Sequence, residues 1–159
     1  MSSKKIILTY GTFDMFHIGH LNLLRVLSEM GSKLIVGVST DHFNSIKGKD
    51  TLVPYEQRAS IVAGIRYVDD VFEESTWDQK RDDIVRLGAH VFAIGDDWAG
   101  KFDDLSDLCE VAYVPRTEGI STTGIKQFSR AMIRGELENV LRGSERVSEI
   151  VGALLGKVV

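Results

Sequence analysis

The sequence has little cysteine and proline, and it has no long hydrophobic run. Cys109 is the only cysteine, which excludes an internal disulfide, and two prolines in 159 residues exclude a proline-rich linker. No apolar run reaches the roughly 20 residues of a membrane-spanning helix, and the segment before Lys5 is too short for the apolar region of a signal peptide. We therefore expect a cytoplasmic protein without a membrane span.

The charge balance also lacks a basic excess. There are 19 Lys and Arg residues against 23 Asp and Glu residues, a formal net charge of -4 at pH 7. Proteins that bind nucleic acid usually carry a basic face, so we expect no nucleic-acid partner, whereas a local basic pocket for a small anion remains compatible with this charge. A hydrophobic share of 43% and a length of 159 residues indicate one compact globular unit.

Short apolar runs alternate with amphipathic stretches along the chain. Buried strands are expected at Lys5 to Tyr10, Lys33 to Ser39, Asp69 to Phe72, His90 to Ile94 and Glu110 to Val114. Helical spacing occurs at Ile18 to Met30, Tyr55 to Tyr67, Trp77 to Leu87 and Ser121 to Gly135. This order predicts an α/β fold with a doubly wound, mostly parallel, five-stranded Rossmann-like sheet and helices on both faces.

The predicted fold also suggests how the chain is organised. We assign residues 1–130 to the α/β domain and residues 131–159 to a C-terminal helical extension, whose broken apolar stripe suits packing or an oligomer contact. In doubly wound sheets, ligands bind outside the carboxyl ends of the strands. The unusual segments that follow those ends are therefore the candidates for a functional site.

The first such segment runs from Gly11 to His20, between a strand and a helix. A helix N-terminus at this place offers free backbone N–H groups to a phosphate. His17 and His20 are three residues apart and share one helical face, so both imidazoles can donate hydrogen bonds to phosphate oxygens. The alternatives are ordinary packing and a zinc pair, although the spacing of the other potential ligands does not suit zinc: His42, His90 and Cys109.

The second segment, Arg116-Thr117-Glu118-Gly119-Ile120-Ser121-Thr122-Thr123, follows the last strand and precedes a helix. Its hydroxyl groups can cap the helix or contact phosphate oxygens, and Arg116 can form a forked pair with a phosphate. The alternative is a capped helix with a surface arginine. Because the doubly wound topology returns this segment to the edge of the first one, two phosphate-suited helix ends are expected to converge.

Charged residues near the same edge have a structural and a functional interpretation. Lys47, Lys49 and Lys80 are either solvated side chains or ligands of an anion, and Arg58 and Arg66 either line a pocket or form salt bridges on a helix surface. Asp14 and Asp41 each follow a strand end, where a carboxylate caps a turn, orients a basic group or binds a water that is linked to a metal ion.

Two motifs carry a family resemblance. His17-Ile18-Gly19-His20 resembles the HxGH signature of nucleotidyltransferases, and residues 116–123 match all eight positions of the RTEGISTT signature of glycerol-3-phosphate cytidylyltransferases. The resemblance extends from Lys5 to Lys126. The chain departs from the family pattern in the basic loop, at Gly48 and at residues 50–51, and in its longer tail after Phe128.

The resemblance implies direct in-line attack of glycerol 3-phosphate on CTP, which yields CDP-glycerol and pyrophosphate for cell-wall or capsule polymers. The implied catalytic residues are His17, His20, Lys49 and Arg116. Implied CTP contacts are these four together with Thr12, Phe13, Thr117, Glu118, Gly119, Ile120, Ser121, Thr122 and Thr123. Lys47, Arg58 and Lys80 are assigned to the acceptor, with Asp14, Asp41, Arg66 and Asp97 as further candidates.

The resemblance also implies Mg²⁺ that arrives with CTP, no metal ligand on the protein, and a homodimer. Two alternatives remain open on the sequence. One is a cytidylyl- or adenylyltransferase of the same fold that acts on another phosphorylated small molecule. The other is a nucleotide-binding module without turnover, against which the intact pair of His17 and His20 counts.

Overall fold

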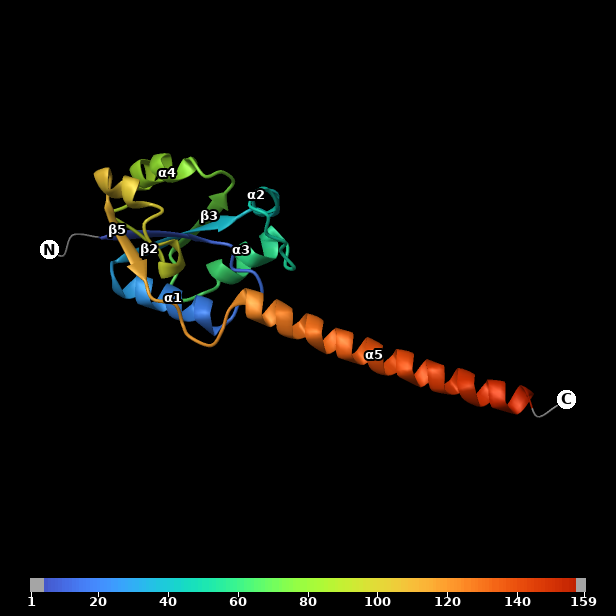
Figure 1. The fold of residues 1–159 in the computed structure, drawn as a ribbon. Coiled ribbons are helices and arrows are strands. Elements are labelled where there is room, and N and C mark those ends of the chain that lie inside the picture. Colours follow the sequence, from blue (N-terminus) through green and yellow to red (C-terminus); the bar gives the residue numbers. More distant parts are fainter. Residues whose placement is uncertain (1–4, 157–159) are drawn as a thin grey trace. The chain divides into compact units, whose positions relative to one another are not determined.

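A computed structural model describes residues 5–156 and divides them into two units, one through Ile120 and one from Ser121 onward (Figure 1). In the first unit, five strands within the described residues form one parallel sheet in the order β3-β2-β1-β4-β5. Their bounds are β1 Ile6–Gly11, β2 Lys33–Ser39, β3 Asp70–Glu74, β4 Val91–Gly95 and β5 Glu110–Val114. The predicted doubly wound parallel sheet is confirmed.

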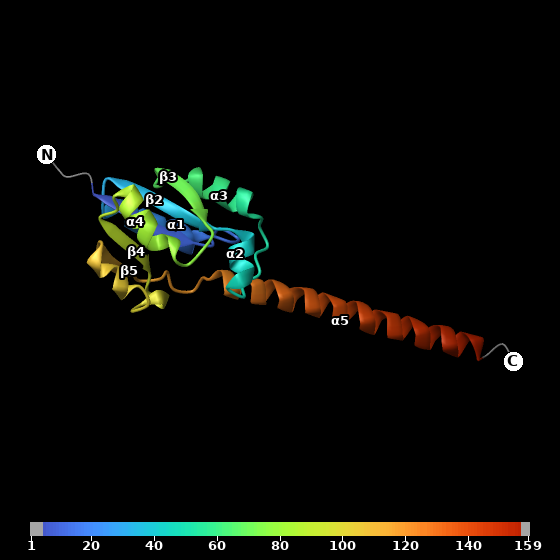
Figure 2. The ribbon, with the colours of Figure 1, turned by 90° about the horizontal axis from the view of Figure 1, so that it is seen from above.

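Helices cover both faces of this sheet (Figures 1 and 2). They are α1 Ile18–Glu29, α2 Asp41–Ile46, α3 Tyr55–Ala63 and α4 Gln79–Leu87, followed by the 3₁₀ turns η1 Asp96–Trp98 and η2 Asp103–Asp107. Alternate strand residues face opposite sides: Ile7 packs in one buried cluster with Leu24 of α1 and Val62 of α3, whereas Leu8 packs in another cluster with Ile84 of α4. Burial on both faces explains why the three central strands, β2, β1 and β4, are mostly apolar runs without polar alternation.

The chain order places a topological switch point between β1 and β4. From β1 the chain passes through α1 to β2, and then to β3, on one side of the sheet, whereas β4 and β5 lie on the other side. Crossover connections leave in opposite directions at this point, so the carboxyl ends of β1 and β4 border a natural crevice. The β1–α1 turn and the segments after β4 and β5 all lie at this edge.

The boundaries of several elements differ from the sequence-based expectation. Helix α2 was not predicted, because six residues are too few to show helical periodicity. Helix α3 ends at Ala63 and not at Tyr67, which leaves Arg66 in the turn that follows. Strand β3 continues two residues beyond the predicted end at Phe72, so that it finishes at Glu74.

The second unit consists of one long helix, α5, from Thr122 to Leu155. Ser121 caps it by accepting a hydrogen bond from the backbone N–H of Gly124 at 3.0 Å. The helix continues without a break past Gly135, where its first stretch was expected to end, into the expected C-terminal helical extension, of which residues 157–159 lie outside the described residues. The proposed domain boundary after residue 130 falls inside this helix and stays a prediction. None of the helices in residues 5–156 combines the length and apolar character needed to cross a membrane.

Candidate active site

The β1–α1 turn has a strained backbone that its surroundings hold in place. Phe13 and Met15 adopt positive φ angles of 52° and 49°, a region that non-glycine residues rarely occupy. Phe13 is buried, and its ring would lie 2.7 Å from a Cβ atom added at Gly11. The carboxylate of Asp14 accepts hydrogen bonds from the backbone N–H groups of Leu52 and Val53. Such strain is typical of functional turns.

His17 and His20 form a stacked pair at the start of α1, with ring centroids 3.8 Å apart. The backbone N–H of Gly19 donates to His17 Nδ1 at 3.0 Å, and the backbone N–H of His17 donates to His20 Nδ1 at 3.3 Å. Because each Nδ1 is an acceptor, the proton of each neutral ring is on Nε2. A Cβ atom at Gly19 would lie 2.8 Å from the His17 ring, so the glycine between the histidines is required for this geometry.

Both imidazoles are held in the neutral form. Burial lowers the pKa of His17, and the positive charge of Arg116 lowers it further. Burial, His17 and Arg116 together lower the pKa of His20 to about 4. The pair therefore presents neutral N–H donors beside a guanidinium group at pH 7, which is an arrangement that can stabilise an anion.

Arg116 and the residues after it approach this pair from the end of β5. A guanidinium nitrogen of Arg116 lies 3.6 Å from a carboxylate oxygen of Asp97. Asn22 of α1 donates to Thr117 Oγ1 at 3.2 Å, and Ile120 Cγ2 would lie 3.3 Å from a Cβ atom at Gly19. The loop after β5 is thus attached to the first turn of α1.

The other residues of the motif at 116–123 lie either in the loop after β5 or at the start of α5. Glu118 and Gly119 are exposed in the same loop, and Gly119 has a φ of 77° that favours glycine. Ser121, Thr122 and Thr123 belong to the second unit, at the start of α5. Their predicted contacts with CTP stay a prediction.

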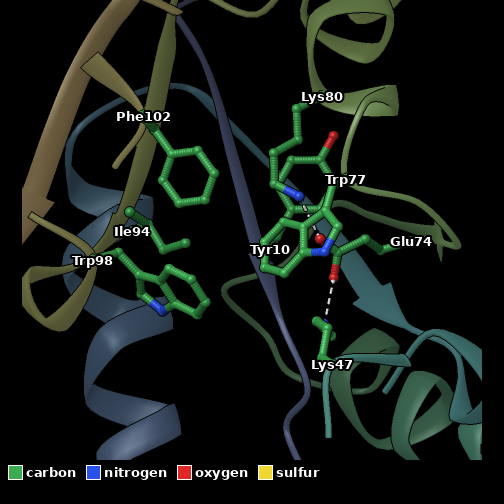
Figure 3. Close-up of a pocket in the computed structure, with 8 residues that line it drawn as sticks. All are labelled: Tyr10, Lys47, Glu74, Trp77, Lys80, Ile94, Trp98 and Phe102. Atoms are coloured by element: carbon green, nitrogen blue, oxygen red, sulfur yellow. Dashed lines mark hydrogen bonds and ion pairs between the residues drawn. The ribbon is translucent and has the colours of Figure 1, made fainter. Parts of the chain in front are cut away.

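A small pocket lies on the α4 side of the sheet, at the carboxyl ends of β1, β3 and β4 (Figure 3). The pocket is small, with a volume of about 30 Å³. Aromatic and aliphatic side chains form most of its wall, and three charged groups lie inside it. The lining residues are Tyr10, Lys47, Glu74, Trp77, Lys80, Ile94, Trp98 and Phe102.

The charged groups of the pocket form a buried triad. Lys80 Nζ donates to Glu74 Oε1 at 2.6 Å, and Lys47 Nζ lies 3.5 Å from Glu74 Oε2. The side chains of Lys47, Glu74 and Lys80 are 8%, 4% and 4% exposed. The Lys80 ammonium also lies 4.6 Å from the centroid of the Tyr10 ring, a cation–π distance. Burial lowers the pKa of Lys47, and the Glu74 carboxylate opposes that change.

Lys49 and Arg116 lie near Trp98 and Asp97, two adjacent residues between the pocket and the histidine pair. Lys49 is exposed, and its ammonium lies 5.4 Å from the centroid of the Trp98 ring. Trp98 directly follows Asp97, the partner of Arg116. The structure therefore brings the predicted residues Lys47, Lys49, Lys80 and Arg116 to one edge of the sheet.

Arg58 has a different place from the one expected of a pocket-lining residue. It is 0% exposed, and its guanidinium donates to the backbone carbonyls of Val53 at 2.8 Å and Thr12 at 2.5 Å and to Asp41 at 2.7 Å. These contacts tie the basic loop to the β1–α1 turn. Its direct role in substrate binding stays a prediction, and so does that of Arg66, which is exposed and stacks over Tyr67.

Sequence reasoning missed several residues of the pocket. Glu74 was not singled out because the strand was expected to end at Phe72, which left two adjacent glutamates in what resembled a solvated loop. Tyr10, Ile94 and Phe102 were interpreted only as core or loop residues. The signal that could have identified Glu74 is its position at the carboxyl end of a strand.

Residues 8–128 match the model of the family described as cytidylyltransferase-like. The chain therefore belongs to the cytidylyltransferase-like family. It is 54% identical to the glycerol-3-phosphate cytidylyltransferase of Staphylococcus aureus over 123 residues, which are 77% of this chain and 93% of that protein. It is also 54% identical to the glycerol-3-phosphate cytidylyltransferase of Bacillus subtilis over 124 residues, 78% of this chain and 95% of that protein. The resemblance carried by the two motifs is confirmed.

A solved structure supports the fold independently. The lipopolysaccharide core biosynthesis protein of Thermoplasma volcanium has a TM-score of 0.61 with this chain at 16% identity, covering 72% of this chain and 98% of that one. At this identity the likeness concerns the fold alone.

Proposed function

We propose that the protein transfers a cytidylyl group from CTP to glycerol 3-phosphate, which produces CDP-glycerol and pyrophosphate. The observation that carries this proposal is the combination, at one sheet edge, of a neutral histidine pair beside Arg116 and a small pocket with two buried lysines. The first arrangement suits a triphosphate, and the second suits the phosphate of a small acceptor. The 54% identity to two glycerol-3-phosphate cytidylyltransferases supports the same pair of substrates.

The proposed reaction is a direct displacement at phosphorus. A phosphate oxygen of the acceptor forms a bond to the α-phosphorus of CTP while the bond from that phosphorus to the β-phosphate oxygen breaks, and pyrophosphate leaves with that oxygen. The second ionisation of a phosphate monoester lies near pH 6, so the attacking oxygen needs no general base at pH 7 or above. Catalysis then depends on positioning and on stabilisation of charge.

Each group of the chain has a defined task in this proposal. The Nε2–H groups of His17 and His20 donate to phosphate oxygens on which charge grows, and Arg116 and Lys49 offset the charge of the departing pyrophosphate. Lys47 and Lys80 hold the acceptor phosphate in the pocket. Thr12 and Phe13 form the turn that borders the nucleotide.

Magnesium is part of the nucleotide substrate in this proposal. Within the described residues 5–156, no group of three or more His, Cys, Asp or Glu side chains could hold a metal ion. The side chains assigned to the triphosphate are donors and cations, so Mg²⁺ would be bound by phosphate oxygens and water. It would offset part of the triphosphate charge.

The test of this function is pyrophosphate release with Mg²⁺, crossing CTP, ATP, GTP and UTP with glycerol 3-phosphate and other phosphorylated polyols and amino compounds. We expect turnover only with CTP and glycerol 3-phosphate. His17→Asn should lower kcat at least about 100-fold, as is usual for a donor to a developing oxyanion, whereas His42→Asn, on the exposed side of α2, should leave kcat unchanged. Faster turnover with another combination of nucleotide and acceptor, or nucleotide binding without turnover, would reject the substrate assignment.

We also propose that the protein is a homodimer in which α5 of one copy packs on α5 of another. The residues from Ile133 to Leu154 at alternating spacings of four and three are apolar at six of seven positions, a pattern typical of a helix–helix seam. These positions are Ile133, Leu137, Val140, Ser144, Val147, Val151 and Leu154. The apolar ones among them are 48% to 69% exposed on α5.

The mass of the full chain in solution tests the dimer. Light scattering should give twice the chain mass for the wild type and the single mass for the double variant Leu137→Ser and Val151→Ser. The variant Glu138→Ser and Glu149→Ser changes residues outside the seam and should remain dimeric. A wild-type monomer, or a seam variant that remains dimeric, would contradict pairing through α5.

We further propose a cytoplasmic enzyme whose product supplies glycerol-phosphate polymers of the cell wall or capsule.

A further inference from the structure

Glu74 occupies a position in the pocket that no sequence motif assigns. It is the last residue of β3, and its two carboxylate oxygens are engaged by cations from two other elements. Lys47 is the C-cap of α2, and Lys80 lies in the first turn of α4. In Figure 3 the two lysines approach Glu74 from opposite sides, while Ile94, Trp98 and Phe102 form the facing wall.

We propose that Glu74 is a positioning residue that holds the Lys47 and Lys80 ammonium groups together as a preformed site for the phosphate of the acceptor. The proposal rests on the proposed function, because it concerns the acceptor of that reaction. Glu74 does not touch the reacting atoms. It acts through the two lysines, one on each carboxylate oxygen.

The charges in the pocket do not balance. Two ammonium groups share one carboxylate, and in the part of the chain that the structure describes neither lysine has an ion pair with any other acid. All three side chains are at most 8% exposed, so water compensates little of this charge. Each ammonium has three donor hydrogens, which leaves donors available to a second anionic partner. A phosphate group in the pocket would supply the missing negative charge.

Without Glu74, the Lys47 ammonium would be difficult to keep charged in this position. Burial lowers the pKa of Lys47, and the neighbouring charges of Lys49 and Lys80 lower it further, whereas the Glu74 carboxylate raises it. Tyr10 of β1 is the other ionisable group among the residues that line the pocket, and its hydroxyl donates to Asp83 of α4. Replacement of the carboxylate by a neutral amide should therefore make Lys47 lose its proton at lower pH or move towards water.

The first experiment compares steady-state kinetics from pH 7 to pH 9.5, above the second ionisation of the acceptor phosphate. For Glu74→Gln we expect a KM for glycerol 3-phosphate at least tenfold higher than in the wild type, a KM for CTP within twofold, and an alkaline limb of kcat/KM that begins at lower pH. Glu74→Asp keeps the negative charge and should retain the position of the alkaline limb. Glu73→Gln, on the adjacent exposed residue, is the matched control and should behave as the wild type.

The second experiment measures binding without CTP and without turnover. The chain has two tryptophans, Trp77 and Trp98, and both line this pocket, so intrinsic fluorescence reports on its occupation. Titration with inorganic phosphate and with glycerol 3-phosphate should give saturable changes in the wild type and in Glu73→Gln. The dissociation constants should rise at least tenfold in Glu74→Gln.

The outcomes separate this proposal from the proposed function. A wild type that prefers another phosphorylated acceptor would reject glycerol 3-phosphate, whereas the phosphate titration would still decide the role of Glu74. A folded Glu74→Gln with unchanged phosphate affinity and an unchanged alkaline limb would overturn the positioning role, as would an equal loss of affinity for CTP. If Glu74→Gln does not fold, Glu74→Asp decides: we expect phosphate affinity three- to tenfold lower, and unchanged affinity would overturn the proposal.

Discussion

The histidine pair should make the stability of the protein depend on pH in a defined window. The pKa of His20 is lowered from 6.5 to about 4 in the folded state, mainly by burial and also by His17 and Arg116. Between these two values the unfolded chain binds a proton at this residue and the folded chain does not. The free energy of unfolding must therefore fall as the pH falls through this window.

The size of this effect follows from the two pKa values. With 6.5 for the unfolded chain and about 4 for the folded one, His20 alone should lower the free energy of unfolding by about 2 kcal/mol at pH 5 and about 3 kcal/mol at pH 4, relative to pH 7.5. His17 changes stability in the same direction, because its pKa is also lowered. Carboxylates contribute to acid unfolding as well, so the effect must be measured as a difference between variants.

Urea unfolding of wild type and His20→Asn at pH 7.5, 6, 5 and 4 measures that difference. We expect the wild type to lose about 2 kcal/mol more than the variant between pH 7.5 and pH 5, and His42→Asn controls for the replacement of an exposed histidine. Observation of the His20 imidazole by NMR should place its midpoint near pH 4. Parallel stability curves for wild type and His20→Asn would refute the reasoning, because His20 would then titrate alike in both states.

Two further substitutions test the supports of the site. Arg58→Lys should lower the free energy of unfolding by at least about 2 kcal/mol, because a lysine cannot satisfy the buried carbonyls that the guanidinium reaches. Urea unfolding measures this loss, with Arg66→Lys at an exposed position as the control. Equal free energies of unfolding for the two variants would contradict a stabilising role of the buried Arg58 contacts. In Gly37→Ala the new Cβ would lie 2.4 Å from the Tyr10 ring, so we expect a loss of about 1–3 kcal/mol and a higher KM for the acceptor. Gly143→Ala, with open space around its Cβ, should keep both values or stabilise the helix.

Much of the fold could be predicted because local signals and tertiary structure agree. The apolar runs predicted all five strands, and both β2 and β5 have the expected bounds. Helix α1 begins at Ile18 as expected, after the histidine cap. The 3₁₀ turns η1 and η2 could not be predicted, since they contain no complete period of an amphipathic pattern.

Site residues could be predicted where their spacing along the chain identifies them. They could not be predicted where their position depends on contacts with residues distant in the sequence. His17 and His20 are identified by their spacing at a strand-to-helix turn, and the structure shows them stacked. Arg58 was expected either to line a pocket or to form a salt bridge on a helix surface, because a charged side chain is normally exposed. Its burial depends on the backbone carbonyls of Thr12 and Val53, which folding places around the guanidinium.

Glu74 shows how the topology could extend such predictions. The final residues of the five strands in residues 5–156 are Gly11, Ser39, Glu74, Gly95 and Val114, and Glu74 is the one that carries a charge. In a doubly wound sheet the carboxyl ends meet the ligand, so a buried acid there must be balanced by cations from the adjoining helices. Lys47 and Lys80, which follow β2 and β3 along the chain, are the cations that the crossover connections bring to that place. A charged residue at a strand end, considered together with the lysines of the neighbouring crossovers, is therefore a sequence signal for the proposed acceptor pocket that residue spacing alone does not contain.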